Sequence, residues 1–158
     1  MERKIDEAAV WKRVTAASTQ STEPVRAATP SPQQALLNAL ITGRTLAGAY
    51  EALRRSGRSA YNEFARGQQR ENRLLRGLYF LHTGQTPHLP EAIPRRDPKE
   101  LYVSRLRWLL ETQDAQQAAL KSLSEKSSGQ TANILADLSQ KAAQRWEGLL
   151  SELAGQLT

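Results

Sequence analysis

The chain of 158 residues has no cysteine, only two histidines and two phenylalanines, and no long apolar run. Without cysteine it forms no disulfide, no thiolate metal site and no cysteine nucleophile, a composition that suits a reducing compartment. No apolar run approaches the ~20 residues that a membrane-spanning helix requires. The opening stretch, MERKIDEAAVWKRV, is charged and lacks an apolar signal core, so we expect a cytoplasmic protein.

The net charge is +6, and the basic surplus is uneven along the chain. Residues 54–107 hold 12 Lys/Arg against 5 Asp/Glu, whereas residues 108–158 hold 4 against 6. A basic face can attract nucleic acid. These arginines recur at helical spacing without a Gly/aromatic RNA-binding signature, so a solvated helix face is the simpler interpretation. The candidate arginines are Arg54, Arg55, Arg58, Arg66, Arg70 and Arg73.

Apolar residues recur at helical spacing in four long segments. The first helix is expected from Ser31-Pro32 to about residue 56, because a cap residue followed by proline is typical of a helix start. The second is expected from about residue 59 to Gly84, and the third from Asp97-Pro98 to a turn at residues 127–129. The fourth is expected over residues 131–157.

The rest of the chain divides into two kinds of segment. Residues 1–16 are predicted to form a short helix with Trp11 as its anchor, and Ser, Thr and Pro make residues 17–31 an extended linker. We therefore separate an N-terminal helix and linker, residues 1–30, from a helical domain, residues 31–158. The stretch from Gln85 to Arg96 contains three prolines and predicts a long crossover between the second and third helices.

Two helical hairpins joined by a proline-rich crossover predict an all-α four-helix bundle. The buried stripe of the second helix is unusual, because Gln68 and Glu71 share the face of Phe64 and Leu75. In the first helix, Gly43 interrupts the corresponding stripe.

Several segments, VWKRV, AYEAL and NRLLRGLYFLHTG, together with the crossover and the second helical pair, resemble the bacterial ferritin-like, rubrerythrin-type proteins. The resemblance covers nearly the whole chain and implies a ferritin-like bundle. Proteins of that family hold two metal ions inside the bundle, with a Glu on each of two helices and a Glu-x-x-His pair on each of the other two.

The positions that match the family's ligands carry different residues in this sequence. The first-helix Glu falls on Gly43 or its neighbour Arg44, and the third-helix Glu falls near Gln113. The second-helix pair falls on Gln68 and Glu71.

The fourth-helix pair falls on Lys141 and Gln144, or alternatively on Ala142 and Arg145. Glu71 is then the one ligand-capable residue in the central layer, and one carboxylate does not hold two divalent ions. His82 and His88 lie at or past the end of the second helix, where capping or solvated positions are more common than metal ligands. We therefore expect no metal, no cofactor and no catalytic residue.

A buried Glu71 needs a partner, because an unpaired charge inside a protein is costly. Arg44 and Arg145, or Lys141, are expected at the same depth, so one hypothesis is a buried ion pair completed by Gln68 and Gln113. The alternative is that Glu71 is partly exposed and Leu74 packs inward.

These residues favour a non-catalytic ferritin-like bundle that has lost its dimetal site and works as an interaction or structural protein. Its partner would be a second copy, giving a homodimer, or another protein. One alternative is a ferritin-like diiron oxidoreductase with differently placed ligands. A second is nucleic-acid binding through the basic helix face. No enzymatic motif, such as a Gly-rich phosphate loop, an HExxH zinc motif or a nucleophile elbow, points to another activity.

Overall fold

The computed structural model describes residues 31–89 and 101–158. The chain divides into two units, Met1–Ser31 and Pro32–Thr158. The predicted N-terminal helix with Trp11 and the linker after it lie outside the described residues. No helix in the part that is described combines the length and apolar character needed to cross a bilayer.

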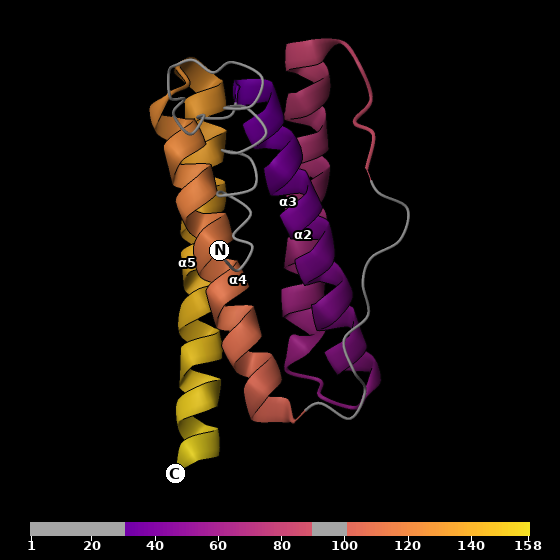
Figure 1. Cartoon of the computed structure of the whole chain (residues 1–158), viewed down its shortest axis with the longest axis vertical. Helices are drawn as coiled ribbons and strands as arrows, with labels where there is room; N and C mark the ends of the chain where they lie inside the picture. The colour runs from indigo at the N-terminus through magenta and orange to yellow at the C-terminus, as the bar shows by residue number, and fades with distance from the viewer. Residues whose placement is uncertain (1–30, 90–100) are drawn as a thin grey trace, which may run out of the picture. The chain divides into compact units, whose positions relative to one another are not determined.

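Four helices make up the second unit: α2 (Pro32–Arg55), α3 (Tyr61–Thr83), α4 (Tyr102–Glu125) and α5 (Gly129–Leu157). Residues 31–89 and 101–158 contain no β-strand, so the predicted all-α class is confirmed for them. The helices follow one another along the chain with short connections within each pair (Figure 1).

Most helix boundaries lie within about two residues of those predicted from sequence. Gly84 ends α3 in the left-handed conformation, with φ 73°, and its N–H donates to Phe80 O. The start of α4 is a correction, because Leu101 is extended and the helix begins at Tyr102. The predicted cap, Asp97-Pro98, lies outside the described residues.

The helices pack as two hairpins, α2 with α3 and α4 with α5. The hairpins meet where α2 lies against α4 and, less closely, where α3 lies against α5. In Figure 1, α3 ends at the top of the unit and α4 begins at the bottom, so these two helix termini lie at opposite ends of the unit. Of the predicted crossover, Pro87 is described, whereas Pro90 and Pro94 are not.

Two separate hydrophobic clusters form the core, one toward each end of the unit. The first cluster lies near the start of α2 and contains Leu36, Ala39, Leu40, Leu75, Leu78, Tyr79, Leu120, Leu123, Leu135, Leu138 and Ala142. The second lies near the end of α2 and contains Leu46, Tyr50, Leu53, Tyr61, Ala65, Leu106, Leu109, Leu110 and Leu149. A four-helix unit has one continuous interior, so the residues between these clusters must be of a different kind.

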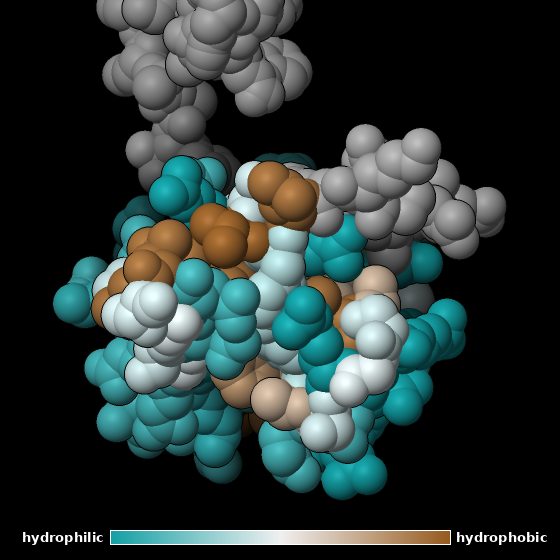
Figure 2. Space-filling model, turned by 90° about the horizontal axis from the view of Figure 1, so that it is seen from below, coloured by the Kyte–Doolittle hydropathy of each residue, from teal (hydrophilic) through white to brown (hydrophobic). Residues whose placement is uncertain are grey.

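The end of the unit at which α4 begins and α5 ends is shown in Figure 2. Its surface is largely hydrophilic, and the hydrophobic residues gather on one side of it. Among the exposed leucines, Leu101 directly precedes α4, and Leu150 and Leu157 lie in the last part of α5. Single exposed leucines are ordinary, but several at one end make an apolar area available for contact.

The clusters lead to a stability prediction. Leu106→Ala removes a side chain that is 0% exposed, and we expect the free energy of unfolding to fall by about 2–5 kcal/mol. Leu81→Ala is the matched control, since Leu81 is 77% exposed and its loss should change stability by less than about 0.5 kcal/mol. Urea denaturation followed by circular dichroism measures both. Equal losses would show that the second cluster is not the core that the packing indicates.

Candidate functional site

A layer of buried polar side chains lies between the two hydrophobic clusters, and we call it the polar layer. Its members are less than 10% exposed, although helix bundles usually place leucine at such positions. They come from three helices: Gln68 and Glu71 of α3, Gln113 and Gln116 of α4, and Arg145 of α5.

An ion pair between Glu71 and Arg145 forms the centre of the polar layer. Arg145 Nη1 donates to Glu71 Oε2 at 2.9 Å, and Nη2 donates to Oε1 of the same carboxylate. The guanidinium therefore occupies both carboxylate oxygens in the parallel two-bond geometry that gives the strongest ion-pair hydrogen bonds. Glu71 is 5% exposed and Arg145 is 9% exposed, so both charged groups have lost most of their hydration. The two hydrogen bonds between them offset much of this desolvation cost.

The ion pair decides between the alternatives that the sequence leaves open. Glu71 points inward, and Leu74 is 46% exposed, so the alternative in which Leu74 packs inward is wrong. Of the candidate cations, Arg145 binds Glu71. Lys141 is exposed and lies 3.5 Å from Asp137. Arg44 lines a surface pocket instead.

The amides of the layer make hydrogen bonds elsewhere, and this corrects the expectation that Gln68 and Gln113 complete the ion pair. Gln68 Nε2 donates to Asn72 Oδ1 at 3.0 Å. The Tyr50 hydroxyl donates to Gln113 Oε1. Burial raises the pKa of Tyr50, so this hydroxyl keeps its proton and remains a donor at neutral pH.

One amide of the layer reaches the main chain of another helix. Gln116 Nε2 donates to Ala39 O at 2.9 Å. Within the described part of the chain, four buried atoms of the layer have no hydrogen-bond partner: Gln68 Oε1, Gln113 Nε2, Gln116 Oε1 and Arg145 Nε. Each such atom costs about 1–3 kcal/mol, so the polar layer is not the most stable filling for this space.

Two glycines give the polar side chains their room. A Cβ at Gly43 would lie 2.3 Å from Asn72 Oδ1 and 3.3 Å from Gln68 Nε2. A Cβ at Gly67 would lie 3.1 Å from Arg145 Nη1. The glycine that interrupts the stripe of α2 therefore has a packing reason, which is the close approach of amides from α3.

The positions that match the family's metal ligands are only partly brought together. Gly43, Gln68, Glu71 and Gln113 are buried at the level of the polar layer. Lys141 and Gln144 are exposed, which corrects their placement as inward positions. The alternative alignment is the one that faces inward, because Ala142 and Arg145 are both buried.

The donor set does not fit a pair of metal ions. Residues 31–89 and 101–158 contain no group of three or more His, Cys, Asp or Glu that could hold one. The single carboxylate of the layer has both oxygens bonded to Arg145. His82 and His88 are both exposed, so neither contributes a donor to the polar layer.

The basic face of α2 and α3 is partly engaged within the chain. Arg54, Arg55 and Arg66 each pair with a glutamate three or four residues before it. The Arg58 guanidinium lies 3.5 Å from the centre of the Tyr102 ring, an arrangement typical of cation–π attraction. These contacts give four of the six candidate arginines a role within the fold.

Comparison of the chain with protein-family models, with curated protein sequences and with solved structures finds no match.

The ion pair predicts strong thermodynamic coupling between its two residues. Glu71→Ala or Arg145→Ala leaves an unpaired buried charge and should cost about 3–5 kcal/mol. The double variant should cost clearly less than the sum, with a coupling of about 1 kcal/mol or more. Arg44→Ala combined with Glu71→Ala is the control, and its effects should add within about 0.5 kcal/mol. Additive losses in the Glu71/Arg145 cycle would contradict the pair.

Gly43 predicts an unusual result for a glycine in a helix. Gly77→Ala, with nothing within 4 Å of the added Cβ, should raise stability by about 0.5–1 kcal/mol through helix propensity. For Gly43→Ala, the change in the free energy of unfolding should be at least about 1 kcal/mol less favourable than that gain. The added Cβ forces Asn72 to move, which breaks its hydrogen bond to Gln68. Thermal and urea unfolding measure both variants. An equal gain at the two sites would show that Gly43 has no packing role.

Proposed function

We propose that the protein is a non-catalytic ferritin-like helical bundle in which an internal ion pair occupies the place of a dimetal site. The observation that supports this most is the Arg145 guanidinium, which bonds both oxygens of Glu71 at the centre of the unit. A cation fixed in the protein neutralises the carboxylate there, as a metal ion would in a ferritin-like site.

The connectivity supports the same proposal. Two antiparallel hairpins with one long connection along the bundle are the arrangement that ferritin-like folds use. Up-and-down bundles, by contrast, join every helix to the next by a short loop. Here α3 ends at one end of the unit and α4 begins at the other (Figure 1).

The proposed role is interaction or structural support, with a second copy or another protein as the partner. The exposed leucines Leu150 and Leu157 of α5 support a contact surface at that end of the unit. An ion pair held inside the bundle gives such a surface a fixed scaffold without a bound cofactor.

Metal analysis tests this proposal. The protein is produced in medium supplemented with iron or manganese, and bound metal is measured after desalting. We expect metal far below one ion per chain. Glu71→Ala, analysed in parallel, separates metal held by the polar layer from metal held at the surface. Near-stoichiometric metal that is lost in Glu71→Ala would overturn the proposal and favour the diiron oxidoreductase.

A further inference from the structure

The large hydrophobic side chains that remain exposed within residues 31–89 and 101–158 fall into two groups. One group lies on the second half of α3, and the other lies beside the start of α4 and on the end of α5. Groups of exposed apolar side chains commonly mark contact surfaces. The first group is Leu74, Phe80 and Leu81, and the second is Leu101, Leu150 and Leu157.

Two leucines of the first group belong to a continuous stripe along α3, which we call the α3 stripe. Its members are four, three and four residues apart, so they share one face of the helix, and all four are exposed. They are Arg70, Leu74, Gly77 and Leu81. Nothing lies within 4 Å of a Cβ added at Gly77, so another helix can approach α3 closely between the two leucines.

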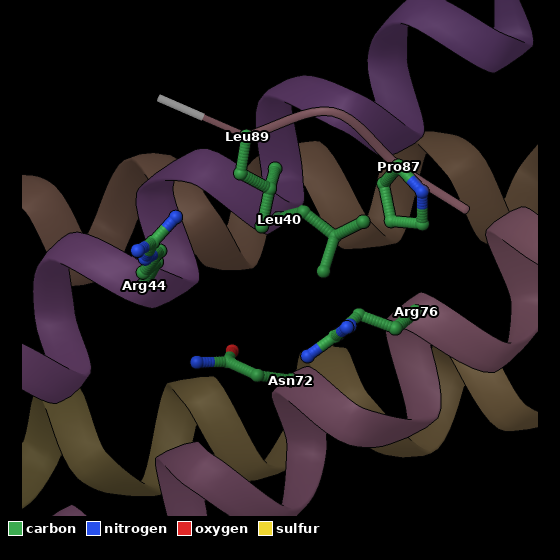
Figure 3. Close-up of a pocket in the computed structure, with 6 residues that line it drawn as sticks. All are labelled: Leu40, Arg44, Asn72, Arg76, Pro87 and Leu89. Atoms are coloured by element: carbon green, nitrogen blue, oxygen red, sulfur yellow. The ribbon is translucent and has the colours of Figure 1, made fainter. Parts of the chain in front are cut away.

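The chain itself contacts the opposite side of α3. Asn72 and Arg76 line a pocket together with residues of α2 and with Leu89 (Figure 3). Asn72 and Arg76 each lie two residues from Leu74, and residues two apart on a helix point in roughly opposite directions. Leu89 packs against the first hydrophobic cluster on that pocket side. The α3 stripe therefore faces away from the side on which Leu89 packs.

The end of α5 carries a second stripe, which we call the α5 stripe. Its members are three, four and three residues apart, and all four are exposed. They are Glu147, Leu150, Ala154 and Leu157. As in the α3 stripe, a charged residue comes first and two leucines lie on either side of a small residue.

The surroundings of the two stripes have opposite charge. Residues 64–89 include four arginines and one acidic residue, Glu71, which is buried and bonded to Arg145. Residues 146–158 include two glutamates and no lysine or arginine. Within the described part of the chain, neither Arg70 nor Glu147 has an ion-pair partner. Opposite charge favours contact of one stripe with the other, whereas contact of a stripe with its own kind would bring like charges together.

The two stripes match member by member when the two helices run parallel. The charged residues then meet, the leucines meet in two layers, and the small residues meet between these layers. In the reverse orientation each charged residue would lie against a leucine and lose part of its hydration. The parallel pairs are Arg70 with Glu147, Leu74 with Leu150, Gly77 with Ala154, and Leu81 with Leu157.

The two stripes of one chain do not reach each other. In Figure 1, α3 ends at the top of the unit, whereas α5 ends at the bottom. Both stripes lie in the later half of their helix, so they lie toward opposite ends of the unit. A contact between an α3 stripe and an α5 stripe therefore joins two molecules.

We propose that the α3 stripe binds the α5 stripe of a second copy of this chain. The two stripes differ, so the contact is head to tail, and each contact leaves one α3 stripe and one α5 stripe open for a further contact. This inference rests on the proposed interaction role and names a second copy as the partner. It does not depend on the polar layer.

Sedimentation equilibrium of the full chain tests whether copies associate. A contact between two helix faces buries little area and is weak, so the protein is measured up to several hundred micromolar. We expect the average mass to rise with concentration above that of a monomer. A mass that stays monomeric over this range would overturn the inference.

Two leucine variants test whether the contact is head to tail. Leu81→Glu alters the α3 stripe and Leu157→Glu alters the α5 stripe, at side chains that are 77% and 61% exposed. Each variant alone should self-associate at least about tenfold more weakly, because a leucine contact is lost. A mixture of the two should form a one-to-one dimer, since each variant keeps the stripe that the other has lost.

A control variant and a charge exchange complete the test. Ala52→Glu, at an exposed position of α2 outside both stripes, should associate as the wild type does. Arg70→Glu and Glu147→Arg should each weaken association at least about threefold, and the double variant should restore it. Circular dichroism verifies that every variant keeps its helices.

The outcomes that contradict the inference are distinct from those that contradict the proposed function. Undiminished self-association of either leucine variant would show that a stripe binds its own kind or that the contact lies elsewhere. Absence of a dimer in the mixture would also exclude the head-to-tail contact. Neither result alters the metal content, which alone decides whether the bundle holds a dimetal site.

Discussion

A single buried ion pair determines how the interior of this protein is arranged. Glu71 and Arg145 lie on helices of different hairpins and are both almost fully buried. Their desolvation is expensive, and a pair of apolar side chains of similar volume is often equally stable or more stable. The surroundings fit the pair: Gly67 makes room for the guanidinium, and the hydrophobic residues separate into a cluster on either side. The polar layer thus has a cost in stability that a plain leucine interior would avoid.

Helical periodicity was enough to predict the all-α class and, in α3, that Gln68 and Glu71 share a buried face with Leu75. It was also enough to identify Arg145 as one of the residues able to reach Glu71. The family resemblance left two alignments open, Lys141 with Gln144 and Ala142 with Arg145, because neither carries the Glu and His that would place the ligand pattern on α5. That choice depends on how α5 is rotated against α3, which is a property of the packed bundle.

Other features could not be predicted because they join segments that are distant in the sequence. Asn72 lies beside the predicted stripe, and its importance is visible only once Gly43 of α2 is next to it. The pocket likewise needs α2, α3 and Leu89 to meet. The predicted hydrogen-bond partners of Gln68 and Gln113 were wrong for the same reason. A side-chain amide has several donors and acceptors to satisfy, and the sequence alone does not say which partners lie within reach.

The cross-helix hydrogen bonds of the polar layer run between the hairpins. Gln113 and Gln116 of α4 join Tyr50 and Ala39 of α2, while Arg145 of α5 joins Glu71 of α3. Leucine contacts tolerate sliding, but these bonds have short range and fixed direction. Moving one hairpin along the other by a single helical turn, about 5.4 Å, would break all of them at once. The hydrogen bonds of the polar layer therefore fix the axial alignment of two hairpins whose other contacts are mainly hydrophobic.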